Sequence, residues 1–252
     1  MRWVVEAFLI FRAGPIRQLL FNLAFLAAVM ILVSLPVVGF ALVWLMFPAL
    51  TIGPHAIARA AANGAPLGPE QLLSGFRENL PAQLRVGGVF LAAMLIVLAV
   101  TAFADDGRFA QAVMGRVPLD LVELQQPELQ RAMLIGAGLQ TALLGALWYA
   151  PLLVAWEGLT VTKAAFFSTA AALINWRAFL AYGVALTLLF SFVLLLALSG
   201  AMLLGGSGAA QANSALFSVI WTLLPVWFAS SYLSYRDVFN SGNAAKSPTI
   251  PA

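Results

Sequence analysis

The sequence has no cysteine, one histidine and very few charged residues. Without cysteine there is no disulfide framework, no thiolate metal site and no cysteine nucleophile. His55 has no second ligand at metal-site spacing, so we expect neither a metal centre nor a cofactor. Only 9% of the 252 residues are charged and 62% are hydrophobic, whereas a soluble domain averages about 25% charged residues. This composition excludes a water-soluble globular protein.

Long apolar runs account for most of the chain. A bilayer core of about 30 Å requires roughly 20 apolar residues in a helix that rises about 1.5 Å per residue. The sequence therefore predicts an all-α polytopic transmembrane helix bundle, with residues 1–240 as one transmembrane domain. The polar, proline-containing tail at 241–252 is predicted to be disordered. Six stretches are long and apolar enough to be spans: about 18–35, 37–56, 84–104, 132–155, 178–204 and 213–234.

The first two predicted spans are separated by little polar sequence. Leu19 to Ile52 is apolar almost throughout, and we interpret Pro36 as the turn because proline removes a backbone donor and disfavours helix in the preceding residue. One long kinked helix is the alternative, and it would give five spans.

The distribution of Lys and Arg predicts the orientation. With six spans and both termini cytoplasmic, Arg108, Arg116 and Arg131 lie outside and the other ten cations lie inside. This is the bias expected of cytoplasmic loops. We therefore expect both the N- and the C-terminus to be cytoplasmic. The ten cations predicted to be inside are Arg2, Arg12, Arg17, Arg59, Arg77, Arg85, Lys163, Arg177, Arg236 and Lys246.

A threefold pattern suggests three pseudo-repeated units, each an interfacial helix followed by a helical hairpin. Partly amphipathic stretches at 3–13, 69–80 and 162–174 precede the three outgoing spans. Residues 79 and 87 also align with 175 and 183 at a spacing of 96, matching Asn with Asn and Gly with Gly. Each returning span carries a Trp, a Pro and a cation in similar register: Trp44, Pro48 and Arg59; Trp148, Pro151 and Lys163; Trp221, Pro225 and Arg236.

The prolines of the returning spans are candidate kink sites. Pro48, Pro151 and Pro225 lie 11 or 12 residues from their cations, which places them roughly 16 Å deep, near the middle of the bilayer. A kink frees a backbone carbonyl that a neighbouring helix, a Ser or Thr, or water must satisfy. Such sites can line a transport path, as broken helices do in transporters. The alternative is that these prolines only shape the bundle.

A cluster of charged and aromatic residues at the predicted cytoplasmic boundary is the candidate lipid or partner surface. Its Lys and Arg side chains are suited to bind lipid phosphates, although Trp and cations also anchor spans at this level. The expected partners are membrane lipids, with another membrane protein or self-association as the alternative and no nucleic acid. The residues are Trp156, Glu157, Lys163, Asn175, Trp176 and Arg177.

Catalytic chemistry has no visible signature in the sequence. HExxH, GxxxxGK[ST] and GxSxG motifs are absent, and no ionisable residue lies deep inside a predicted span. We therefore expect a non-enzymatic protein, with a small-solute or lipid transporter or channel as the alternative. Small residues four apart, at 138, 142 and 146 and at 197, 201 and 205, are expected to let helices of the monomer approach closely, with pairing of protomers as the alternative.

Three segments resemble a family of uncharacterised multi-spanning bacterial inner-membrane proteins of the domain-of-unknown-function type. They are APLLVAWEGLTVTKAAFFSTAAALINWRAFLAYG at 150–183, FPALTIG at 47–53 and SYRDVF at 234–239. The likeness spans most of the chain, is sharpest at 163–182 and is weakest at 105–131. The resemblance implies a bacterial inner-membrane location and assigns no activity, ligand or catalytic residue to any position.

Overall fold

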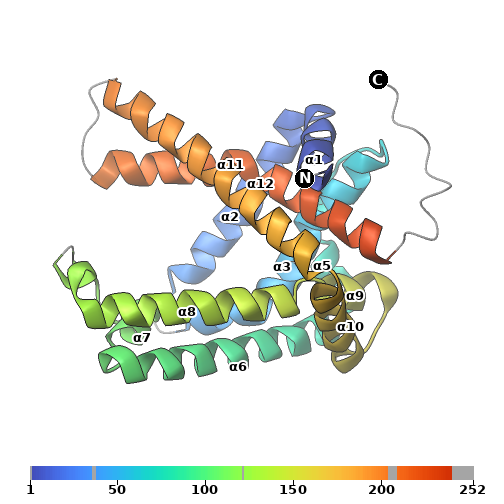
Figure 1. Ribbon diagram of the computed structural model, residues 1–252. Coiled ribbons are helices and arrows are strands. Elements are labelled where there is room, and N and C mark those ends of the chain that lie inside the picture. The colour runs from blue at the N-terminus through green and yellow to red at the C-terminus, as the bar shows by residue number, and fades with distance from the viewer. Residues whose placement is uncertain (1, 36–37, 121, 204–208, 240–252) are drawn as a thin grey trace. The chain divides into compact units, whose positions relative to one another are not determined.

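The computed structural model describes residues 2–35, 38–120, 122–203 and 209–239, and every regular element in these ranges is helical (Figure 1). The prediction of an all-α membrane bundle is confirmed, because each predicted span overlaps one helical segment that is long and apolar enough to cross a bilayer. The six segments are Pro15–Val33, Gly39–Ala62, Leu80–Asp105, Pro127–Glu157, Trp176–Leu203 and Gln211–Phe239.

The first apolar run forms two helices, α2 (Pro15–Val33) and α3 (Gly39–Ala62). Six spans rather than five therefore describe the chain. The predicted turn at Pro36 and the predicted disordered tail at 241–252 lie outside the described residues.

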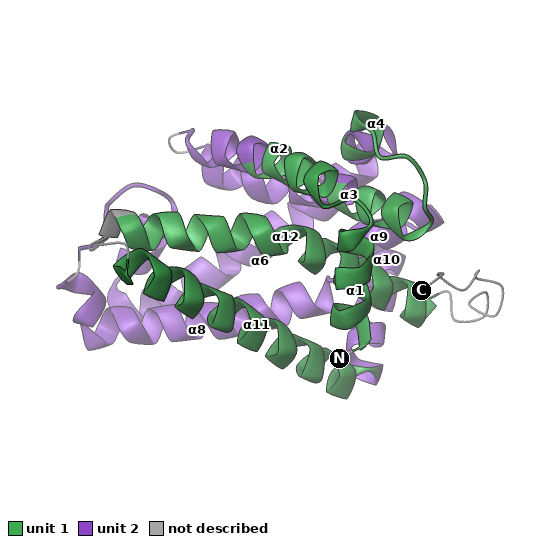
Figure 2. Ribbon diagram, turned by 90° about the horizontal axis from the view of Figure 1, so that it is seen from above, with its two compact units in different colours: residues 1–26, 54–72, 175–252 green, residues 27–53, 73–174 purple. Residues whose placement is uncertain are grey.

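The chain divides into two compact units (Figure 2). Unit 1 comprises residues 1–26, 54–72 and 175–252, and unit 2 comprises residues 27–53 and 73–174. Helices α2 and α3 each contribute one part to both units. Unit 1 also contains α1 (Arg2–Arg12), α4 (Pro69–Leu72), α11 (Trp176–Leu203) and α12 (Ala209–Phe239). Unit 2 also contains α5 (Ser74–Arg77), α6 (Leu80–Asp105), α7 (Arg108–Val113), the 3₁₀ turn η1 (Glu123–Gln125), α8 (Pro127–Ala146), α9 (Ala150–Glu157) and α10 (Val161–Ile174).

The core of unit 1 forms around α12, against which both α1 and α11 pack. Phe228 and Tyr235 of α12 are almost fully buried, and the ring of Phe25 packs edge-on against Phe228 at 5.3 Å. By contrast, α11 buries only Tyr182, whose hydroxyl shares a hydrogen bond with Ser230 at 2.8 Å. Most of α11 therefore presents apolar side chains outward, as expected of a lipid-facing span.

The core of unit 2 forms where α6 and α8 lie side by side (Figure 1). Gly136 on α8 packs against Phe109 and Thr101, and a Cβ at this glycine would lie 3.0 Å from the Phe109 ring. Gly138 was the predicted small-residue contact, but a Cβ there would meet nothing within 4 Å. The prediction was wrong for this position because Gly138 lies away from the buried face formed by Leu129, Ala132 and Gly136.

Helices occupy all three stretches that precede an outgoing span, but the middle stretch is not one amphipathic helix. It contains α4 and α5, and α6 begins within it at Leu80. Gly75 of α5 lies so close to α3 that a Cβ there would be 1.8 Å from the carbonyl oxygen of Ala49. Asn79 then adopts a left-handed conformation with φ of 56° at the start of α6.

The spacing of 96 residues matches one structural position and not the other. Asn79 and Asn175 each directly precede an outgoing helix, α6 and α11. Gly87 lies against α3, where a Cβ would be 1.9 Å from the carbonyl oxygen of Leu45, whereas a Cβ at Gly183 would meet nothing within 4 Å. The two aligned glycines therefore have different packing roles.

Candidate functional site

The fourth span is interrupted at residues 147–149, directly before Pro151, and α10 packs beside this break. The backbone N–H of Tyr149 donates a hydrogen bond to Ser168 Oγ at 3.0 Å, and Thr169 Oγ1 donates to the carbonyl oxygen of Ala146 at 3.3 Å. Two side chains of α10 thus form hydrogen bonds with backbone groups that have lost their helical partners at the interruption. These two protein groups stabilise the break.

The neighbouring helix α6 makes a third contact with the same segment. Gln83 is fully buried, and its Nε2 donates a hydrogen bond to the carbonyl oxygen of Pro151 at 3.0 Å. This contact fixes the Pro151 segment to buried Gln83 of α6 and so favours the bundle-shaping interpretation of Pro151.

The other two candidate kink sites lie inside helices. Pro48 is in α3, where Thr51 Oγ1 donates to the Pro48 carbonyl oxygen at 3.0 Å, and Pro225 is in α12. Unit 1 contains a cavity of about 580 Å³ beside the link between α1 and α2 and another of about 360 Å³ between α11 and Trp227. None of the three prolines lines either of these two cavities. A transport role for the three prolines stays a prediction.

Helix α10 packs small side chains against the bundle and carries large apolar side chains on its exposed side. Its buried residues are Ala164, Ser168 and Ala171, which lie three or four positions apart and so share one helical face. The opposite face carries large apolar side chains that stay exposed: Phe166 is 67% exposed, Phe167 45%, Leu173 69% and Ile174 80%. Lys163 lies on this same outward face, three positions before Phe166.

This arrangement is the reverse of a water-facing helix, which buries its large apolar residues. With 14 residues, α10 is about 21 Å long and too short to cross a bilayer core of about 30 Å. Small inward residues let it lie close to α8 and α9, while the four large outward residues stay 45–80% exposed. We refer to Lys163, Phe166, Phe167, Leu173 and Ile174 as the outward face of α10.

The six predicted surface residues divide between the two units. Trp156 and Glu157 end α9, and exposed Lys163 lies on α10, so these three belong to unit 2. Asn175 belongs to unit 1 and precedes α11, which begins with exposed Trp176 and Arg177. The Arg177 guanidinium lies 5.5 Å from the centre of the Trp176 ring, a cation–π distance. Sequence reasoning identified Lys163 but missed the four apolar residues beside it, since an apolar residue in an apolar chain carries no distinguishing signal.

A second charged cluster lies between α1 and α12 in unit 1 and was not predicted from the sequence. Asp237 accepts hydrogen bonds from Trp3 Nε1 at 2.9 Å and from Arg2, and Arg236 pairs with Glu6 at 3.4 Å. The bond to Asp237 raises the pKa of Arg2 above its ordinary value. These residues are separated by more than 200 positions, so only the fold brings them together. They join the start of the described chain to the end of its last span.

His55 and two acidic residues of the segment between the third and fourth spans have structural partners. His55 Nε2 lies 3.0 Å from Ser231 Oγ, and its ring packs against Phe228. In the predicted outer loop, Asp105 accepts a hydrogen bond from the N–H of Phe109 at 2.6 Å, and Glu123 pairs with Arg108. No group of three or more metal-ligating His, Asp or Glu residues occurs in the part of the chain that the structure describes.

Comparison with known proteins supports the membrane assignment. No family model and no solved structure matches the chain. A "probable inner membrane protein" of Burkholderia thailandensis is 30% identical over 244 residues, which cover 94% of this chain and 89% of the relative. The alignment therefore includes both units and all six candidate spans. The chain belongs to the family of this relative, a family of multi-spanning bacterial inner-membrane proteins.

Proposed function

We propose that this protein acts without enzymatic chemistry, through contact of the outward face of α10 with membrane lipid or with a protein partner. One observation carries the proposal: a helix too short to span the bilayer keeps four large apolar side chains exposed and packs its small residues inward. Exposed apolar surface of this kind needs a cover, which an acyl-chain region or another protein supplies.

The position of α10 makes the contact rigid. Ser168 and Thr169 bind the interrupted backbone of the fourth span, so the outward face is fixed to the bundle by hydrogen bonds as well as by packing. Lys163 adds one positive charge at the edge of this face, and a cation near an anionic leaflet contributes about 1 kcal/mol of attraction. An apolar face with a cation at its end suits an interface of lipid tails and phosphates.

We further propose that both termini are cytoplasmic. Ten of the thirteen cations fall on the side of the termini when six spans are threaded in order, as the bias of cytoplasmic loops requires. In this orientation α10 lies at the cytoplasmic surface, because it connects the fourth span to the fifth.

The experiment compares lipids and proteins that remain bound after gentle extraction from the native membrane. Phe166→Gln combined with Phe167→Gln removes the aromatic part of the outward face. Phe103→Gln is the matched control, because Phe103 is 93% exposed in the same unit but lies on α6. Mass spectrometry of the intact complexes should show one component reduced several-fold in the double variant and unchanged in the control.

The outcomes separate the possible functions. A stoichiometric protein lost only from the double variant identifies an assembly or regulatory subunit, and a lipid class lost in the same way identifies a lipid contact. Retention of every component by the double variant contradicts the proposal. A solute bound equally by all three proteins would instead favour the transporter alternative.

A further inference from the structure

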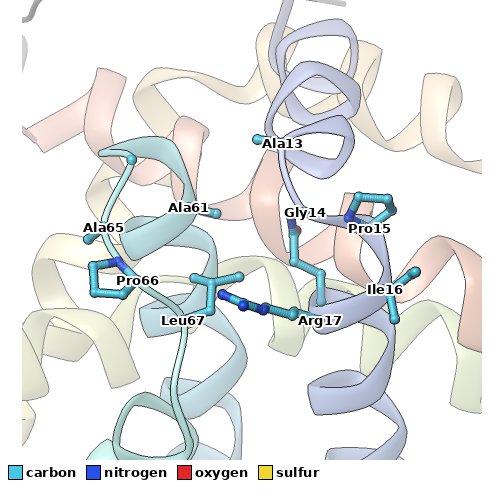
Figure 3. A pocket seen from close by; sticks show the side chains of 11 residues that line it. Ala13, Gly14, Pro15, Ile16, Arg17, Ala61, Ala65, Pro66 and Leu67 are labelled. Atoms are coloured by element: carbon cyan, nitrogen blue, oxygen red, sulfur yellow. The ribbon is translucent and has the colours of Figure 1, made fainter.

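The cavity of about 580 Å³ in unit 1 lies where the first span begins and the second span has just ended (Figure 3). One wall is the link from α1 to α2, residues 13–18, and the other is the end of α3 with the following loop, residues 61–67. Because both spans reach the membrane surface at this end, the cavity lies at the level of lipid headgroups. Its lining is apolar or neutral except for Arg17.

Arg17 is positioned to meet a ligand rather than another side chain. Figure 3 shows its side chain reaching from α2 toward Leu67, across the cavity. Within the described residues Arg17 makes no ion pair. The carboxylates of Glu6 and Asp237 are held by Arg2 and Arg236, and Glu70, whose carboxylate lies against Gly68, does not line the cavity.

Gln18 fixes the wall from which Arg17 extends. It is 1% exposed, and its Nε2 donates hydrogen bonds to the carbonyl oxygens of Ile10 at 3.0 Å and Phe11 at 3.3 Å. These carbonyls belong to the last turn of α1, so Gln18 caps α1 and fixes the angle between α1 and α2. The cavity is therefore built into the fold and does not depend on the ligand to form it.

An apolar stripe runs along α2 from the cavity. Ile16, Leu20 and Leu23 are exposed by 72%, 57% and 37%, and their spacing of four and three residues places them on one helical face. A cation at the headgroup level with an apolar stripe leading away from it matches a phospholipid, which has a phosphate joined to acyl chains. A soluble phosphate would use the cation and leave the stripe without a role.

We propose that this cavity binds the phosphate of a membrane phospholipid, with Arg17 as the charged contact and Ile16, Leu20 and Leu23 as the acyl-chain contacts. Arginine is suited to this because its planar guanidinium forms paired hydrogen bonds with phosphate oxygens. The inference is independent of the proposed role of α10, because Arg17 and the cavity belong to unit 1 and α10 belongs to unit 2.

The test is native mass spectrometry of the purified full-length protein in detergent, titrated with three probes. Phosphatidylglycerol carries phosphate and acyl chains, diacylglycerol carries the chains alone, and inorganic phosphate carries the anion alone. We expect retention of phosphatidylglycerol above diacylglycerol. Arg17→Gln should weaken phosphatidylglycerol binding about fivefold, and Arg17→Lys should retain part of the affinity.

Two further variants separate the cavity from general surface charge. Arg12→Gln removes an exposed cation five positions earlier that does not line the cavity, and it should change binding less than twofold. Ala61→Phe keeps every charge but places a ring in the cavity, because Ala61 points from the end of α3 toward Gly14 (Figure 3), and it should reduce phosphatidylglycerol binding as Arg17→Gln does. Equal effects of Arg12→Gln and Arg17→Gln, or unchanged binding by Ala61→Phe, would overturn the proposal. Inorganic phosphate that displaces the lipid with the same dependence on Arg17 would overturn the lipid assignment in favour of a soluble phosphate.

Discussion

Gly87 and Gly88 are adjacent on α6 and provide a sharp test of the packing in unit 2. A Cβ at Gly87 would lie 1.9 Å from the carbonyl oxygen of Leu45 and 2.6 Å from its carbonyl carbon, whereas a Cβ at Gly88 would meet nothing within 4 Å. The obstructing atoms at Gly87 are backbone atoms of α3, so no side-chain rotation relieves the contact. Gly87→Ala must therefore move one helix away from the other.

The expected energies have opposite signs. Overpacking a tight contact costs about 1–3 kcal/mol, while replacing an unobstructed helical glycine with alanine gains about 0.5–1 kcal/mol. Both variants gain the same helix propensity, so this gain cancels, and we expect Gly87→Ala to be less stable than Gly88→Ala by about 1–3 kcal/mol, the overpacking cost alone. The comparison isolates packing because the two substitutions are chemically identical and differ only in what the new methyl group meets.

Unfolding by SDS in mixed micelles, followed by tryptophan fluorescence, would measure this difference. The ring of Trp44 stacks on Phe90 of α6 at 6.4 Å, close to the altered contact, so its emission should report separation of α3 from α6. Equal midpoints for the two variants would refute the close approach of these helices.

Three further predictions concern the break, the terminal cluster and the orientation. Ser168→Ala should lower the free energy of unfolding by about 1–3 kcal/mol, because it removes the acceptor of the buried Tyr149 N–H. Thr162→Ala, on the exposed side of α10, should change the free energy of unfolding by less than about 0.5 kcal/mol. Equal losses for the two variants in the same SDS titration would argue against the role of Ser168 at the break. Asp237→Ala should lower the free energy of unfolding by about 2 kcal/mol through loss of the Trp3 hydrogen bond. Glu128→Ala, which breaks an ion pair between exposed side chains, should lower it by less than about 1 kcal/mol. Equal unfolding midpoints for the two variants would contradict a stabilising role of the terminal cluster. Since the chain has no cysteine, Arg116→Cys and Arg12→Cys provide single labelling sites: an impermeant maleimide should label intact cells only at position 116, and the reverse pattern would show the opposite orientation.

The spans could be predicted from the sequence because membrane insertion depends on composition and length. A helix of about 20 apolar residues can span the bilayer whatever the direction of its side chains, so the positions of the spans can be predicted without knowledge of packing. Proline also predicted candidate kinks in the returning spans, and the helix is interrupted directly before Pro151, whereas Pro48 and Pro225 lie inside α3 and α12. These features depend on residues that are close together in the sequence, so they can be predicted from one sequence.

Contacts between helices could not be predicted from the sequence in the same way. The role of Ser168 depends on a backbone N–H that lies 19 residues earlier, and the role of Asp237 depends on Trp3 at the other end of the chain. The glycines show the same limit: position 138 was expected to pack and is open, while position 136 packs on Phe109. Pattern spacing identified helices that contain small residues but could not give the rotation of each helix about its own axis.

The candidate surface was predicted in part for a related reason. Lys163 stands out in the sequence because charge is rare in this chain. Phe166, Phe167, Leu173 and Ile174 do not stand out, and their importance follows from the observation that α10 buries Ala164, Ser168 and Ala171 instead. In a membrane protein, the informative feature is therefore which apolar side chains remain uncovered at a helix too short to span.

A spin label at position 167 tests the central claim about α10 most directly. Phe167→Cys introduces the only cysteine, and electron paramagnetic resonance then compares collisions of the label with oxygen, which concentrates in lipid, and with a water-soluble nickel chelate. The proposal predicts strong oxygen contact and weak nickel contact in reconstituted bilayers, with low access to both reagents in native membranes if a protein covers the face. A label at position 116 provides the water-exposed reference. Nickel access at 167 equal to that at 116 would place the outward face in water and contradict the claim.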